Sequence, residues 1–173
     1  GIFGFKPTYG FVSTDRVHPL ATALDTVGWF TRSTEDLALV GSVLSTTQSS
    51  LLGPTPSPLR VGIIRTSDWR HASPAAQRAI EVVAAVIDEA GVEVRDLQLP
   101  DDFDGLGAAW ETAIAVGAAS AFSVEYGEHR ESLSAPLIAL IEDGRALGSA
   151  ARSESESLAL HCRAAVSETF AQV

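Results

Sequence analysis

Apolar residues recur at helical spacing near the start of the chain. In residues 33–46 four positions fall at i, i+3, i+4 and i+7 and build one apolar stripe: Leu37, Val40, Gly41 and Leu44. Ser33, followed by Asp36 three residues later, predicts a capping box at the start of this segment. We therefore expect a helix over residues 33–46 with one buried face.

The middle of the chain alternates between strand and helix patterns. Residues 60–65 and 92–99 are typical of strands, and Ser73-Pro74 predicts an N-cap and first helical turn between them. Four apolar residues at helical spacing follow that turn: Ile80, Val83, Ala84 and Ile87. Gly91 is placed to end the helix. We expect a βαβ unit whose two strands are parallel and joined by a right-handed crossover.

The flanking segments differ in pattern, and the expected fold class is α/β. Residues 1–30 carry spaced Gly and Pro and predict short strands and turns. Three helices are expected after the βαβ unit: about 104–126 with Asp104 as cap, 134–144, and from about 149 to the end. The chain divides into four parts of one incomplete domain: a motif-rich segment (1–46), a Pro/Ser linker (47–59), the βαβ unit (60–100, its elements at about 60–99) and a helical region (101–173).

Charge and composition exclude several functions. The chain has 173 residues, 12 Lys and Arg against 22 Asp and Glu, and a net charge of −10. A nucleic-acid surface needs a basic patch, so we expect no direct nucleic-acid binding. No apolar run reaches the roughly 18 residues that span a bilayer, and we expect no membrane segment. The single Cys162 excludes an internal disulfide and favours a reducing, cytoplasmic location.

The first dense motif is Gly4-Phe5-Lys6-Pro7-Thr8. It is not a phosphate-binding P-loop, because Phe5 stands where Gly must precede Lys6 and Pro7 removes a backbone N–H. Lys6 could serve as the base for a serine nucleophile, but nothing in the sequence places a serine beside it. We favour a structural or ion-pair role for Lys6 at the end of a strand.

The second dense motif runs from Leu24 to Arg32. Its candidate substrate-pocket residues are Asp25, Thr26, Gly28, Trp29 and Phe30. The alternative, which we favour, is a turn packed on the core, with Asp25 capping backbone N–H groups and Arg32 pairing with Asp36. On that interpretation the structural motif residues are Gly4, Lys6, Pro7, Thr8, Arg32 and Asp36.

Metal and cofactor chemistry have no candidate residues in the sequence. The four histidines lack metal-ligand spacing and are expected at surface or partly buried positions: His18, His71, His129 and His161. The acidic pairs Glu128/Glu131 and Glu154/Glu156 are typical of solvated helix faces. We expect neither a metal nor a cofactor.

The two motifs together resemble the amidase signature family. Its members carry stretches of the type G-x-x-G-x-K-P-T-Y-G, L-D-T-V-G and T-R-S-x-x-D-L-A, then a strand of L-R-V-G-I type and a later strand ending in L-P. The matching residues here are Gly1 to Gly10, Leu24 to Gly28, Thr31 to Ala38, Leu59 to Ile63 and Leu99-Pro100. Trp29-Phe30 departs from the commoner Gly-Pro form and is closer to small-amide amidases of plants and bacteria. The resemblance implies the amidase signature fold, a mixed sheet with helices on both sides.

The resemblance also implies amide hydrolysis through a Ser–cis-Ser–Lys triad, with a small-molecule amide as substrate. In the family these three residues precede the K-P-T motif, so we expect them upstream of Gly1 and carry over no catalytic residue. Lys6 corresponds to the motif lysine, and the linker pair Ser49-Ser50 lacks flanking glycines. By analogy, residues 110–126 and 133–141 would help to enclose the acyl side of the substrate.

Three functions remain open on the sequence. The chain is part of an amidase, part of an amidotransferase subunit of the same fold that delivers ammonia to a charged tRNA, or a non-catalytic α/β interaction module. The first two predict unpaired strand edges, exposed apolar area and no turnover by these 173 residues alone. The module would instead fold as a stable separate domain. A homodimer is left open.

Overall fold

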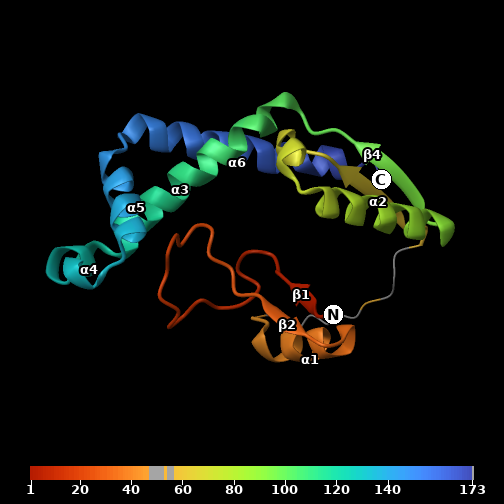
Figure 1. The fold of residues 1–173 in the computed structure, drawn as a ribbon, viewed down its shortest axis with the longest axis horizontal. Coiled ribbons are helices and arrows are strands. Elements are labelled where there is room, and N and C mark those ends of the chain that lie inside the picture. Colours follow the sequence, from red (N-terminus) through yellow and green to blue (C-terminus); the bar gives the residue numbers. More distant parts are fainter. Residues whose placement is uncertain (47–52, 54–56, 173) are drawn as a thin grey trace. The chain divides into compact units, whose positions relative to one another are not determined.

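The computed structural model of the protein describes residues 1–46, 53 and 57–172 (Figure 1). The chain divides into two compact units. The first unit comprises Gly1–Pro54 and Trp110–Arg152, and the second comprises Thr55–Ala109 and Ser153–Val173. Most of the predicted linker, with Ser49-Ser50, lies outside the described residues. The division into one incomplete domain with four parts stays a prediction.

A short antiparallel sheet and a capped helix open the first unit. Strands β1 (Phe3–Phe5) and β2 (Trp29–Thr31) pair with Phe3 opposite Thr31 and Phe5 opposite Trp29. Helix α1 (Thr34–Leu44) follows β2 directly and contacts both strands. The Ser33 hydroxyl accepts the backbone N–H of Asp36 at 3.1 Å, which confirms the Ser33 half of the predicted capping box. The predicted stripe is buried at Gly41, half-buried at Leu37 and Val40, and exposed at Leu44.

The second unit contains the predicted βαβ unit. Strands β3 (Arg60–Ile64) and β4 (Glu93–Leu97) are parallel, and helix α2 (Pro74–Glu89) lies between them in sequence. Ser73 caps α2 by accepting the Ala76 N–H at 3.2 Å, and Gly91 turns the chain with φ of 80°. Short 3-10 helices follow each strand: η1 (Ser67–His71) and η2 (Asp101–Gly105). The predicted apolar face of α2 is only partly buried, because Ile80 and Val83 are 40% and 51% exposed.

The helical region departs from the prediction at three places. The expected helix over 104–126 is interrupted at Phe122, whose φ of −101° and ψ of 21° leave the helical region. Asp104 does not cap it but lies within η2, and α3 begins at Leu106. Gly144 does not end the next helix but lies inside it, packed on another helix. The observed elements are α3 (Leu106–Ala121), α4 (Ser123–Glu128), η3 (Arg130–Ser132), α5 (Ala135–Ala146) and α6 (Ser149–Phe170).

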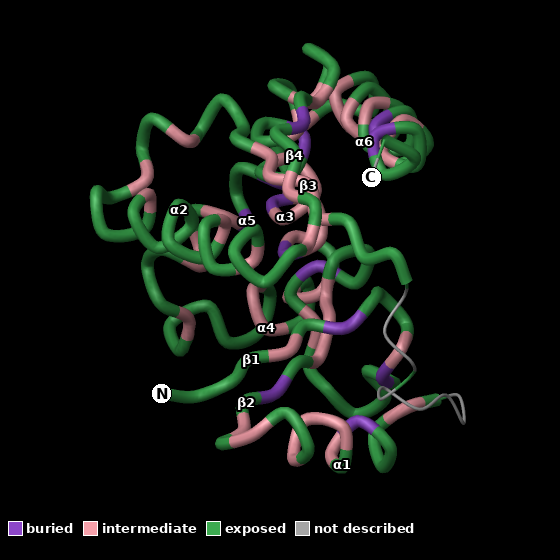
Figure 2. Tube along the Cα trace, turned by 90° about the vertical axis from the view of Figure 1, so that its right-hand side faces the viewer, coloured by how far each residue is buried: buried purple, intermediate pink, exposed green. Residues whose placement is uncertain are grey.

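Buried positions are few in both units (Figure 2). The buried apolar residues of the first unit are Val12, Ala21, Trp29, Ala115, Ala118 and Ile141, and those of the second are Leu97, Ala109 and Cys162. Large apolar side chains stand exposed on α1 (Leu39, Val43), on β2 (Phe30) and on α2 (Val82, Val86). Within the described residues each sheet has two strands. The α/β class and the expected exposure of apolar area are therefore confirmed, and the antiparallel and parallel pairs form separate sheets.

No helix in the described part of the chain is long and apolar enough to cross a bilayer.

Candidate functional site

The two dense motifs meet at the β1–β2 pairing. Antiparallel pairing brings Phe5 and Trp29 together, so the β1–β2 loop (residues 6–28) closes at its base. The rings of Phe5 and Trp29 pack with centroids 5.0 Å apart. A Cβ atom on Gly4 would stand 2.8 Å from the Phe30 ring, and one on Gly28 would stand 2.6 Å from the Phe5 carbonyl oxygen. Gly28 is therefore required by close approach to backbone across the strand pair, whereas a side chain at position 4 would meet only the exposed ring of Phe30.

Asp25 organises the second half of this loop. Its carboxylate accepts the backbone N–H of Leu20 at 3.0 Å and that of Ala21 at 3.1 Å. The Thr26 hydroxyl donates to the Leu24 carbonyl at 3.3 Å. The predicted capping of backbone N–H groups by Asp25 is confirmed, while a pocket role for Asp25, Thr26 and their neighbours stays a prediction.

The adjacent aromatic residues Trp29 and Phe30 have opposite environments. Trp29 is buried, and its indole N–H donates to the Leu37 carbonyl of α1 at 3.1 Å. Phe30 is 75% exposed. Trp29 therefore joins β2 to α1, and Phe30 is the side chain of the pair that presents apolar surface.

The remaining motif residues form the turn that leaves β1. The Lys6 ammonium donates to the Pro7 carbonyl at 2.8 Å, and Pro7 is buried. The Thr8 carbonyl accepts the Phe11 N–H at 3.0 Å, and Gly10 has φ of 79°. These contacts support a structural role for the motif.

The predicted Arg32–Asp36 ion pair is wrong: none of the ion pairs in residues 1–46, 53 and 57–172 joins these side chains. Asp36 lies in the first turn of α1, where a carboxylate is favoured by the helix dipole without a basic partner.

The β1–β2 loop is also attached to the helices of the first unit, which the sequence did not predict. Ala21 is buried, and a Cβ atom on Gly117 of α3 would stand 2.6 Å from it. His18 contacts Glu125 of α4 at 3.0 Å. Since His18 and Glu125 are 107 residues apart, no local sequence signal could have paired them.

A polar cluster joins α4 and η3 to α5 in the same unit. Tyr126 and Arg130 both donate to one carboxylate oxygen of Glu142 at 2.8 Å. The Arg145 guanidinium stacks on the Tyr126 ring at 4.0 Å. The Arg130 hydrogen bond is the main cause that holds the pKa of Glu142 below its ordinary value, followed by that of Tyr126.

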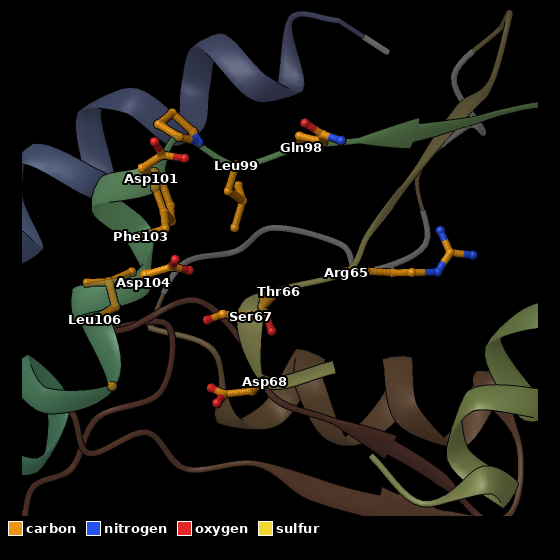
Figure 3. Close-up of a pocket in the computed structure, with 12 residues that line it drawn as sticks. Arg65, Thr66, Ser67, Asp68, Gln98, Leu99, Asp101, Phe103, Asp104 and Leu106 are labelled. Carbon is orange, nitrogen blue, oxygen red and sulfur yellow. The ribbon is translucent and has the colours of Figure 1, made fainter. Parts of the chain in front are cut away.

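A cavity of about 330 Å³ lies in the second unit, where the parallel strands β3 and β4 end (Figure 3). Thr66, Ser67 and Asp68 line one side, and the other side is formed by residues 98–101, 103, 104, 106 and 107. Arg65 also borders it, but its guanidinium is directed away and pairs with Asp96. The sequence marked Leu99-Pro100 as a strand end and Asp104 as a helix cap, but it did not predict a cavity.

Within the part of the chain that the structure describes, no three His, Cys, Asp or Glu side chains are grouped as a metal site would require.

Comparison with known proteins decides the family. The family model described as Amidase matches residues 1–135. The chain belongs to the amidase family. The resemblance noted in the two motifs is therefore confirmed.

Individual relatives of this amidase-family chain support the same assignment. It is 35% identical over 114 residues to a glutamyl-tRNA(Gln) amidotransferase subunit of Thermus thermophilus, which covers 58% of the chain and 24% of that protein. It is 57% identical over 44 residues to amidase 1 of Arabidopsis thaliana, or 25% of the chain and 10% of that protein. A crystal structure of an amidase superposes with a TM-score of 0.84 at 21% identity, over 98% of this chain and 38% of that one. The chain thus spans less than two fifths of these relatives.

Proposed function

We propose that these residues belong to an enzyme that hydrolyses the carbon–nitrogen bond of a small-molecule amide. The observation that carries the proposal is that both family motifs converge on one closed loop, the β1–β2 loop, in a chain whose residues 1–135 match the amidase family. The 57% identity over 44 residues to amidase 1 of Arabidopsis thaliana supports an amidase.

The chain would supply scaffold, and the Ser–Ser–Lys triad would lie outside these 173 residues. Lys6 is the motif lysine; its ammonium donates to the Pro7 carbonyl, and in residues 1–46, 53 and 57–172 no serine hydroxyl is bonded to it. A catalytic lysine must instead stand within hydrogen-bond reach of a serine hydroxyl. On this proposal Asp25 and Trp29 hold the floor of the site through the contacts described above, while the exposed ring of Phe30 is available to a substrate or to further protein.

An amidotransferase subunit is the second candidate, favoured by the 35% identity to the Thermus thermophilus protein. The net charge of −10 argues against direct contact of this part of the chain with tRNA. A non-catalytic interaction module is the third, and the exposed apolar residues of α1 and α2 argue against it as a separately stable domain. We further propose a cytoplasmic enzyme without cofactor; a homodimer remains an open arrangement.

The first experiment measures ammonia or amine release from a panel of amides. The isolated 173 residues are expected to show no turnover, and an amidase-length polypeptide that carries them is expected to hydrolyse at least one amide. In that polypeptide Lys6→Ala should change the turnover by no more than several-fold. The matched control is Arg32→Ala, which removes another exposed cation. Turnover by the isolated chain that Lys6→Ala abolishes would overturn the proposal.

A second experiment separates the two enzymatic candidates. An amidase releases ammonia from its substrate without an acceptor, whereas an amidotransferase subunit should transfer glutamine-derived ammonia only with its partner subunits and charged tRNA present. Ammonia release that does not respond to these additions supports the amidase.

A further inference from the structure

His18 faces a hydrogen-bond acceptor with each of its ring nitrogens. Nδ1 lies 3.0 Å from the Pro19 carbonyl oxygen, and Nε2 lies 3.0 Å from Oε1 of Glu125. The ring also stacks on Phe122, with centroids 4.6 Å apart and planes at 34°. His18 thus contacts its own loop, the start of α4 and a carboxylate within α4.

To bond both acceptors, His18 must donate a hydrogen bond from each of its two ring nitrogens. A neutral imidazole carries one N–H and one acceptor nitrogen, so it can satisfy Pro19 or Glu125 but not both. The imidazolium donates from both nitrogens and adds charge attraction to Glu125. The geometry therefore fits the protonated ring.

The contact attaches the β1–β2 loop to α4 near the loop's apex. Other contacts that attach the loop to the rest of the first unit are of a different kind: Ala21 makes an apolar contact with Gly117, and the Thr46 hydroxyl donates to the Gly10 and Phe11 carbonyls at 3.2 Å. Neither involves an imidazole. Loss of the His18 proton would thus weaken one attachment and leave these in place.

We propose that His18 is a positioning residue whose protonated ring fastens the β1–β2 loop to α4, and whose deprotonation releases the apex of that loop. The loop carries Asp25 and the Gly28-Trp29 junction. An effect on turnover rests on the proposed function, whereas the release of the loop does not.

The electrostatics agree with the geometry. The hydrogen bond to Glu125 is the main cause that raises the pKa of His18, followed by the bond to the Pro19 carbonyl. The hydrogen bond to His18 is likewise the main cause that lowers the pKa of Glu125, and His129 lowers this pKa further. The ion pair between His18 and Glu125 is therefore fully formed at pH values between the two pKa values. It weakens as pH rises through the raised pKa of His18, because the ring loses its proton. It also weakens as pH falls through the lowered pKa of Glu125, because the carboxylate gains one. The other charged or titratable groups on the two elements are Lys6, Tyr9, Asp15, Arg16 and Asp25 in the loop, and Tyr126 and Glu128 in α4.

The test is hydrogen exchange of the β1–β2 loop, followed across pH and corrected for the intrinsic rate. In the wild-type protein, protection of amides near His18 should fall several-fold as pH rises through the raised pKa of His18. Both His18→Gln and Glu125→Ala should remove that pH dependence and leave the loop at its low-protection level. Asp102→Asn is the matched control, because Asp102 pairs with the exposed His161 at 3.0 Å in the second unit, and it should change nothing in the loop.

A histidine titration by NMR provides the second readout. Glu125→Gln should move the pKa of His18 downward, and Asp102→Asn should not. The proposal is overturned if His18→Gln keeps full low-pH protection of the loop, or if Glu125→Gln leaves the pKa of His18 unchanged. These measurements need no turnover, so their failure and the failure of the proposed amide hydrolysis are distinguishable.

Discussion

Gly28 lies directly against the backbone of Phe5. A Cβ atom at position 28 would stand 2.6 Å from the Phe5 carbonyl oxygen and 3.5 Å from the Lys6 Cα. These are backbone atoms held by the β1–β2 pairing, so they cannot move aside as a flexible side chain would. The family motif L-D-T-V-G thus ends in Gly for a packing reason.

Gly28→Ala is expected to destabilise the protein by about 1–3 kcal/mol or more, since the added methyl forces the strand pair apart. Denaturant unfolding of the variant measures this. Gly107→Ala is the control, because a Cβ atom there meets nothing within 4 Å and Ala favours the α3 helix. Equal stability of Gly28→Ala and wild type would contradict the close approach.

Gly144→Ala should be more disruptive still. A Cβ atom on Gly144 would overlap the Ala115 carbonyl group of α3, so α5 would have to shift. We expect the first unit to lose its fixed packing and its cooperative unfolding. The loss of packing would be visible in the near-ultraviolet circular dichroism spectrum. Gly127→Ala on α4, with open space around it, should remain folded. Retention of a wild-type spectrum by Gly144→Ala would show that the two helices do not pack this closely.

Ser33→Ala removes the oxygen that accepts the Asp36 N–H at the start of α1. The expected cost is about 1 kcal/mol of unfolding free energy. Ser42→Ala in the same helix is the control, because that hydroxyl only bonds back to the Leu39 carbonyl and Ala has the better helix propensity. Thermal or denaturant unfolding distinguishes them, and similar losses for both would argue against a capping role.

Glu142→Gln should destabilise the protein in a pH-dependent manner. Because the folded-state pKa of Glu142 is lowered, mainly by Arg130, its contribution is present above the unfolded pKa and disappears as pH falls through the folded value. The stability difference between wild type and Glu142→Gln is therefore expected near neutral pH and should vanish in strong acid. Unfolding curves across this range measure it. A difference that persists unchanged in acid would mean that the carboxylate's charge is not involved.

Local elements were predictable from particular residues. Ser33 and Ser73 bond to N–H groups three positions ahead, and Gly91 takes the positive φ that ends α2. Each of these interactions lies within one turn of chain, so its whole cause is contained in the local sequence. The parallel pairing of β3 and β4 follows as well, because a helix of α2's length is the usual crossover between parallel neighbours.

Other features have no local cause and could not be predicted. Gly144 has the residue type of a helix end, yet its role comes from contact with α3. Phe122 interrupts a segment whose composition is helical throughout. The sequence predicts a surface or partly buried position for His18, and the structure gives it a partner on α4. The apolar face of α2 has the predicted spacing, but burial depends on what else packs there.

The amino-acid sequence by itself determined the capped helices, the βαβ unit and, through two short motifs, the amidase family. Only the tertiary structure decided which glycines touch backbone, and that His18 meets Glu125. The physical reason is the range of the interactions. Caps and turns are satisfied by residues a few positions away, whereas close packing and long-range ion pairs depend on where separate segments come to lie.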